Sequence, residues 1–152
     1  MTHLRVGDKA PLFTGINQNG VKISLSDFKN KKLILYFYPK DNTPGCTAES
    51  CNLNNHYQYF LKEGYQVLGV SPDDEKSHIK FITKYKLSFD LISDIGKDIC
   101  VAYGVFGKKK FMGKEYMGVH RTTFIIIDGF IDQIYLKVDT KKHSEQIIES
   151  YK

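Results

Sequence analysis

The sequence has little of several features that define other classes of protein. Only three cysteines occur among 152 residues, and this odd number argues against a permanent disulfide framework, so any pairing is expected to be transient and chemical. Arginine occurs only at Arg5 and Arg121, and the other basic residues are lysines. No apolar run approaches the roughly 20 residues of a membrane span, and charged side chains interrupt residues 1–11, where a secretion signal would be apolar. These absences predict a cytoplasmic protein without a membrane segment.

The composition predicts one folded domain that spans residues 1–152. Hydrophobic residues make up 41% of the chain and charged residues 26%, with 12 glycines and 4 prolines, so nothing indicates a disordered tail. The net charge of +5 is spread along the sequence, and the only tight basic run is 108–110. Because nucleic-acid binding needs basic residues concentrated on one surface, we expect no nucleic-acid partner.

Short apolar runs separated by turn residues predict an alternation of strands and helices. The expected strands are 32–38, 65–70, 91–92, 122–127 and 130–136, with an edge strand near 21–25. The expected helices are 46–63, 73–85, 94–103 and 140–151. The turn Asp128-Gly129 joins two of the strands as a hairpin. This order predicts an α/β fold, a central mixed β-sheet with helices on both faces.

Cys46 follows a central strand and a turn-forming stretch at 39–45, so it lies in the first turn of the next helix. The unpaired N–H groups and the positive dipole end of that helix stabilise a thiolate, which is the nucleophilic form of cysteine. Ligands of such sheets bind beyond the carboxyl ends of the strands. Cys46 is therefore a candidate nucleophile, and the alternative is a buried structural cysteine.

Cys51 lies five residues after Cys46 on the same predicted helix. Ideal helix geometry separates the two Cα atoms by roughly 8 to 9 Å, whereas a disulfide needs them within about 7 Å. A bond between the two sulfurs would require local unwinding. The segment favours this because it is rich in mediocre helix formers: Thr47, Ser50, Asn52, Asn54 and Asn55.

Several motifs resemble one known family. The pattern PxxxTxxC occurs as Pro39, Thr43 and Cys46 within TPGCTAESC, and it resembles the active-site motif of peroxiredoxins, in particular the peroxiredoxin Q or bacterioferritin comigratory protein group. The stretches FGKKKFMGKEYMG and GVHRTTFIIID extend the resemblance over essentially the whole chain. It implies a thioredoxin-like fold and a thiol-dependent peroxidase that reduces hydrogen peroxide and organic hydroperoxides in antioxidant defence.

Carried onto this sequence, the resemblance implies a role for each matching residue. Cys46 would be the peroxidatic cysteine and Cys51 the resolving cysteine that forms an intramolecular disulfide with it. Thr43 would hydrogen-bond the peroxide, Pro39 would shield the site, and Arg121 would place a guanidinium beside the thiolate. An arginine in a lysine-rich chain also suits this role physically, since only guanidinium offers a rigid fork of donors.

Some assignments stay open at this point. Glu49 either orients Arg121, as the resemblance suggests, or is a solvated acid of the first helical turn. Cys51 could instead be an inert helix cysteine, and Cys100 is either a small buried hydrophobe or an alternative resolving cysteine. The histidines lack metal-ligand spacing and are expected to be solvated or internally hydrogen-bonded.

The expected chemistry needs neither a metal nor an organic cofactor. The resemblance implies reduction by thioredoxin or a similar dithiol, and a monomer suffices because both sulfurs belong to one chain. A thioredoxin-type disulfide oxidoreductase would use a CxxC pair, which the four-residue gap between Cys46 and Cys51 does not match. A zinc module is also disfavoured, since CxxxxC with a distant third cysteine is no structural zinc pattern.

Overall fold

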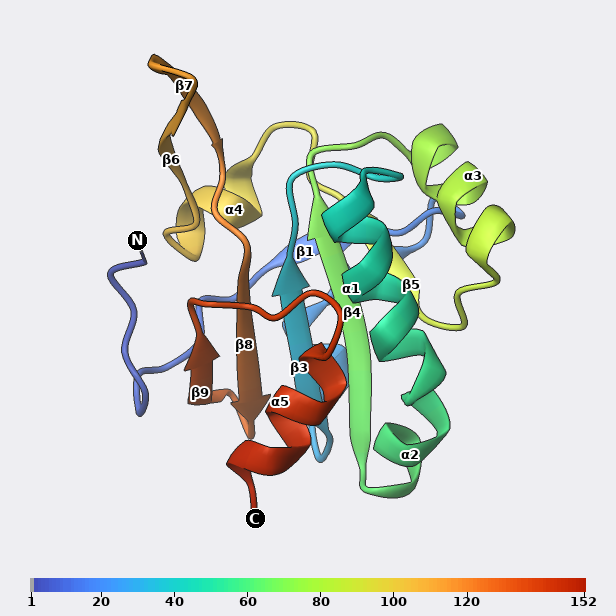
Figure 1. Cartoon of the computed structure of the whole chain (residues 1–152). Coiled ribbons are helices and arrows are strands. Elements are labelled where there is room, and N and C mark those ends of the chain that lie inside the picture. The colour runs from blue at the N-terminus through green and yellow to red at the C-terminus, as the bar shows by residue number, and fades with distance from the viewer. Residues whose placement is uncertain (1) are drawn as a thin grey trace.

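A five-stranded mixed sheet forms the centre of the computed structural model, which describes residues 2–152 (Figure 1). Its order is β5-β4-β3-β8-β9. The strands are β3 (Lys32–Phe37), β4 (Tyr65–Ser71), β5 (Asp90–Ser93), β8 (Thr122–Ile127) and β9 (Phe130–Tyr135). β3 pairs with β4 in parallel and with β8 antiparallel, so the carboxyl end of β3 meets the start of β8.

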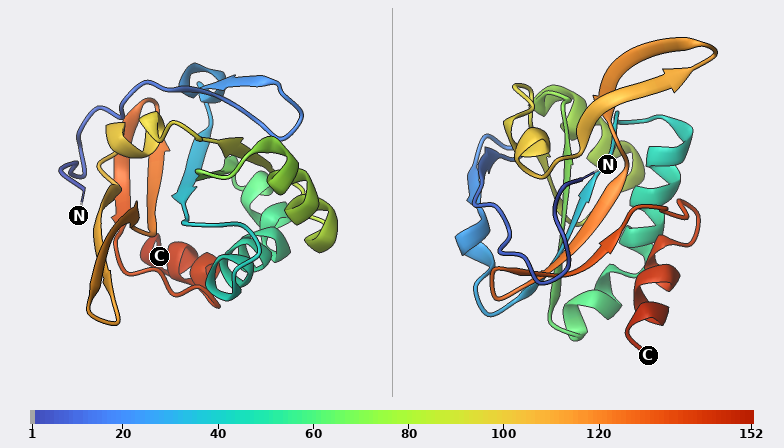
Figure 2. Two further views of the ribbon diagram at one scale, coloured as in Figure 1. Left: turned by 90° about the horizontal axis from the view of Figure 1, so that it is seen from above. Right: turned by 90° about the vertical axis from the view of Figure 1, so that its left-hand side faces the viewer.

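Successive side chains of β3 point to opposite faces of the sheet and enter two separate cores. Leu33, Leu35 and Phe37 belong to one core, and Ile34, Tyr36 and Tyr38 belong to the other. The second core is covered by α1 (Pro44–Asn55), α2 (Tyr57–Lys62), α3 (Glu75–Tyr85) and α5 (His143–Ser150). The first is covered by α4 (Asp98–Ala102) and the 3-10 helix η1 (Leu25–Phe28). Helices on both faces are therefore confirmed, as the view from above shows (Figure 2).

The helix predicted over 46–63 is in fact two helices. α1 ends at Asn55 and α2 begins at Tyr57, with His56 between them. Tertiary hydrogen bonds hold the C-terminal end of α1. The Asn54 side chain donates to the Lys86 carbonyl at 3.0 Å and accepts from the Ser88 N–H at 2.8 Å. These contacts hold α1 against the chain that follows α3, and local helix periodicity does not reveal them.

The N-terminal strand does not join the central sheet. β2 (Lys22–Ser24) pairs instead with β1 (Thr14–Ile16) in a separate two-stranded sheet. A strand does occur near 21–25 as predicted, but the prediction that it forms an edge of the central sheet is wrong. The sheet edges are β5 and β9. Strand propensity alone identifies a strand but does not choose its neighbour.

A second two-stranded sheet was not predicted. β6 (Phe106–Phe111) and β7 (Lys114–Val119) form a hairpin that projects beyond the body of the molecule (Figures 1 and 2). Its lysine-rich sequence is largely exposed and lacks the apolar alternation by which half-buried strands are recognised. Within residues 2–152, no helix combines the length and the apolar character that crossing a membrane requires.

Candidate active site

Cys46 is the third residue of α1 and lies beyond the carboxyl end of β3. Thr43 is the N-cap in an extended conformation, and Pro44 occupies the first turn, where its missing N–H leaves no bond unmade. The Cys46 side chain is 1% exposed. A thiolate at this position faces the free N–H groups and the positive end of α1.

Arg121 reaches Cys46 from the neighbouring strand. It directly precedes β8, whose Thr122 pairs with Phe37 at the end of β3. Its Nη2 donates to the Cys46 sulfur at 3.3 Å, and its Nη1 donates to Glu49 Oε1 at 2.7 Å. A Cβ atom at Gly45 would lie 3.1 Å from Nη2, so the absence of a side chain there leaves room for the guanidinium.

Glu49 is fully buried, so it is not a solvated acid of the first turn. Burial raises the pKa of Glu49 to about 7, outweighing the opposing effect of Arg121. Its Oε2 has no hydrogen-bond partner among the described residues. Arg121 therefore donates hydrogen bonds to two groups that can be negative, the Cys46 sulfur and the Glu49 carboxyl.

His143 of α5 is a neighbour of Glu49 that the sequence did not reveal. Its Nε2 lies 3.7 Å from Glu49 Oε2 and is within 2.8 Å of the Thr123 hydroxyl, while its Nδ1 lies 2.9 Å from Gln146 Oε1. Burial lowers the pKa of His143 to about 4. The ring is consequently neutral at pH 7, and its contact with Glu49 is not an ion pair.

The raised pKa of Glu49 makes a testable contribution to stability. The folded state holds this proton more tightly than the unfolded chain, so the contribution is complete below about pH 4.5 and is lost as the pH rises to about 7. We expect the free energy of unfolding to fall by about 3 kcal/mol less between pH 4.5 and pH 8 in Glu49→Gln than in the unmodified protein. Urea unfolding of both proteins at pH 4.5 and pH 8 measures it, and parallel stability curves would contradict the burial effect.

Thr43 and Pro39 border the same loop. The Thr43 hydroxyl donates to the Lys40 carbonyl at 2.9 Å, which leaves its oxygen lone pairs as acceptors. Pro39 is half-buried and directly follows the buried Tyr38. The loop thus presents a hydroxyl oxygen that can accept a hydrogen bond from an incoming O–H group.

Cys51 is half-buried on α1, and burial raises the pKa of its thiol. Next to it, Asn52 ties α1 to α5: its side chain donates to the Lys141 carbonyl and to Glu145 Oε1, both at 2.9 Å, and accepts from the Ser144 N–H at 2.6 Å. These tertiary contacts hold a helix whose own sequence has low helix propensity.

Cys100 lies on the opposite face of the sheet from Cys46. It is fully buried in the core beneath α4, and burial raises the pKa of its thiol far above the usual range. The three cysteines are free thiols in the described chain. Only Cys51 shares a helix with Cys46.

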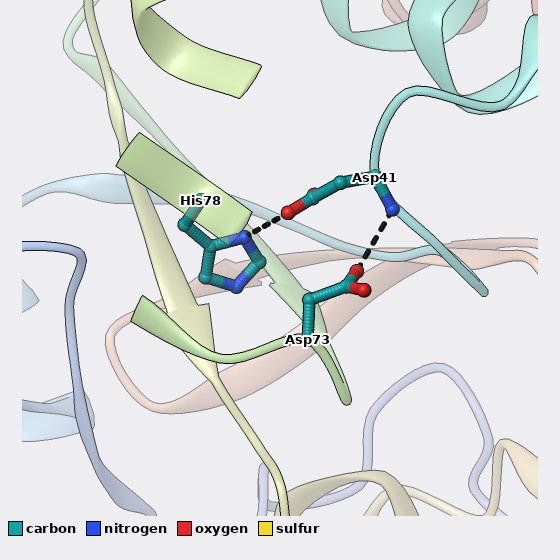
Figure 3. A group of neighbouring side chains, drawn as sticks. All are labelled: Asp41, Asp73 and His78. Atoms are coloured by element: carbon teal, nitrogen blue, oxygen red, sulfur yellow. Dashed lines mark hydrogen bonds and ion pairs between the residues drawn. The ribbon is translucent and has the colours of Figure 1, made fainter. Parts of the chain in front are cut away.

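The loop that leads to Cys46 is anchored by a cluster of Asp41, Asp73 and His78 (Figure 3). Asp41 Oδ2 lies 2.7 Å from His78 Nδ1, and the Asp41 N–H donates to Asp73 Oδ2 at 2.8 Å. His78 Nε2 lies 3.0 Å from the Ile92 carbonyl. Both ring nitrogens of His78 thus face oxygen atoms, one of a carboxylate and one of a backbone carbonyl. The ligand atoms that a metal would need are engaged in these bonds.

The site residues lie within a region of extensive similarity to known proteins. Residues 6–134 match the AhpC/TSA family. The chain is 45% identical over 150 residues to a putative peroxiredoxin bcp of Haemophilus influenzae, covering 98% of this chain and 97% of the relative. It is 39% identical over 149 residues to peroxiredoxin Bcp of Escherichia coli K12, covering 97% and 96%.

Solved structures give the same result. A PrxQ mutant from Xylella fastidiosa matches with a TM-score of 0.92 at 32% identity, covering 99% of this chain and 97% of that one. The bacterioferritin comigratory protein of Xanthomonas campestris, solved in a study of its alkyl peroxide reduction activity, matches with a TM-score of 0.87 at 32% identity, covering 99% and 96%. The similarity thus extends over the whole fold and is not confined to the loop around Cys46.

Proposed function

Since this chain belongs to the AhpC/TSA family and is a thiol-dependent peroxidase of the Bcp or PrxQ type, we propose that Cys46 is its peroxidatic cysteine and Cys51 its resolving cysteine. Such enzymes act on hydroperoxides and are regenerated by thiol reductants. One observation carries the assignment: the Arg121 guanidinium lies 3.3 Å from the Cys46 sulfur at the start of α1.

In the first step the Cys46 thiolate attacks the terminal oxygen of the hydroperoxide. A sulfur–oxygen bond forms, the O–O bond breaks, and the alkoxide or hydroxide leaves and takes up a proton, so Cys46 becomes a sulfenic acid. Arg121 and the N–H groups of α1 stabilise the negative charge as it moves from sulfur to oxygen. Thr43 orients the peroxide by accepting its O–H. The chain's own residues supply these roles.

In the second step Cys51 condenses with the sulfenic acid, which forms the disulfide and releases water. This requires α1 to unwind locally, because helix geometry holds the two Cα atoms roughly 8 to 9 Å apart. A dithiol such as thioredoxin then reduces the disulfide by exchange. Both sulfurs come from one chain, so the cycle is complete in a monomer, and the reducing cytoplasm supplies the dithiol.

The substrates in this proposal are hydrogen peroxide and organic hydroperoxides, and the role is antioxidant defence. The alkyl peroxide reduction described for the Xanthomonas campestris relative supports the organic substrates. Neither Arg121 nor Thr43 contacts more than the O–O group in the proposed mechanism, so the chemistry itself does not depend on the organic substituent.

Tryptic mapping tests the assignment directly. Residues 41–62 form one tryptic peptide that contains both Cys46 and Cys51, whereas Cys100 lies in the peptide 98–108. After one equivalent of peroxide, we expect the first peptide to lose two hydrogen atoms and both alkylatable thiols, while Cys100 remains alkylatable as an internal control. A cross-link between the two peptides, or an unchanged first peptide, would reject the pairing.

A further inference from the structure

Lys109 differs from the lysines on either side of it. Lys108 and Lys110 are exposed, but Lys109 is half-buried. Because strand residues alternate between faces, Lys109 of β6 points to the opposite side of the hairpin from its two neighbours. It shares that face with Tyr116, which is its cross-strand partner on β7.

The Lys109 side chain is directed toward the segment that carries Arg121. Its Nζ donates to the Val119 carbonyl at 3.0 Å, and Val119 is the last residue of β7, two positions before Arg121. On the way its stem crosses Gly118, where a Cβ atom would lie only 3.0 Å from Lys109 Cδ. The absence of a side chain at Gly118 thus leaves room for this path.

The charges around Lys109 are those of the active site. Burial lowers the pKa of Lys109, the positive charge of Arg121 lowers it further, and the charge of Cys46 opposes both effects. Burial lowers the pKa of His120, and the charge of Lys109 adds to this effect. The geometry links the same groups: Lys109 binds the Val119 carbonyl two residues before Arg121, and Arg121 donates to the Cys46 sulfur.

The active site holds more than one buried group that can carry a negative charge. Cys46 as a thiolate and Glu49 as a carboxylate are two buried negative groups, and Arg121 donates to both of them. Holding a second cation near Arg121 is unfavourable unless an anion nearby offsets the repulsion. The thiolate is that anion.

We propose that Lys109 is a second cation of the peroxidatic site, a positioning residue whose charge stabilises the Cys46 thiolate. Its hydrogen bond to the Val119 carbonyl also fixes the backbone two residues before Arg121. The inference rests on the proposed role of Cys46 and adds to it a residue that lies outside the PxxxTxxC motif. Through Lys109, the projecting β6–β7 hairpin would contribute to the reactivity of Cys46.

Lys109→Met and Lys110→Met form a matched pair for the test, since each removes one positive charge from the same strand. Both are made in a Cys51→Ser background, so that Cys46 is the only thiol in the peptide 41–62. We expect Lys109→Met to shift the pH profile of Cys46 alkylation by iodoacetamide to higher pH and to slow the single reaction with hydrogen peroxide about fivefold. Lys110→Met should change either rate less than about twofold, because charge on the exposed face is screened.

Two further variants make the result decisive. Lys109→Arg should keep both rates within about twofold of the background protein, because it retains the charge. Lys109→Gln retains a donor for the Val119 carbonyl without the charge, and it should behave like Lys109→Met. Equal rates for Lys109→Met and Lys110→Met would overturn the inference, as would a fully active Lys109→Gln. A background protein that does not react with peroxide would instead refute the role of Cys46 itself.

Discussion

Replacing Cys46 by serine is expected to abolish peroxide consumption. The serine hydroxyl stays protonated at neutral pH and lacks the nucleophilicity of a thiolate, even beside Arg121. The side chain is 1% exposed and serine is close to cysteine in size, so the fold should persist. We expect the rate to fall by at least about three orders of magnitude.

The loss of hydrogen peroxide from solution measures this effect with excess dithiol present. Cys100→Ser serves as the matched control, because it removes a thiol on the other face of the sheet and should leave the rate unchanged. Thermal unfolding checks that both variants are folded. Substantial consumption by folded Cys46→Ser would show that another thiol is the nucleophile.

Replacing Cys51 by serine is expected to stop the cycle after one turnover. The first step depends on Cys46, Thr43 and Arg121, all of which remain, so one equivalent of peroxide should be consumed at the rate of the unmodified protein. The sulfenic acid then has no partner on α1, since Cys100 lies across the sheet. Steady-state turnover with thioredoxin should fall about 100-fold, because exchange requires a disulfide.

Stopped-flow kinetics give the size of the first turnover, and a coupled thioredoxin reductase assay gives the steady state. Dimedone labelling of the peptide 41–62 should trap the sulfenic acid in Cys51→Ser and much less of it in the unmodified protein. Unchanged steady-state turnover in this variant would mean that Cys51 is not the sole resolving thiol.

The central strands could be predicted from the sequence because burial on both faces leaves continuous apolar runs. The run at 32–38 is β3 extended by one residue, and Thr122–Ile127 is β8 with the predicted bounds. The β6–β7 hairpin could not be predicted in this way, since its exposed lysines give no periodic signal. Among its lysines, Lys109 alone is half-buried.

The neighbours of Cys46 are a different case. Arg121 lies 75 positions from Cys46, and no local pattern relates the two; only the family motif suggested the contact, which the β3–β8 register explains. His143 was expected to be solvated or internally hydrogen-bonded, and the second alternative is the one found. Its proximity to Glu49 depends on the packing of α5 against α1, which helix periodicity does not specify.

The contacts of Asn52 with α5 set a timing limit on the proposed cycle. A freshly oxidised Cys46 must wait for α1 to release the Lys141 carbonyl, Glu145 and Ser144 before Cys51 can reach it. During that delay the oxidised Cys46 sulfur can instead attack a second peroxide molecule, breaking its O–O bond and forming a sulfinic acid that thiols do not reduce. Weakening the Asn52 hydrogen bonds should therefore favour disulfide formation over overoxidation of Cys46 in the proposed cycle.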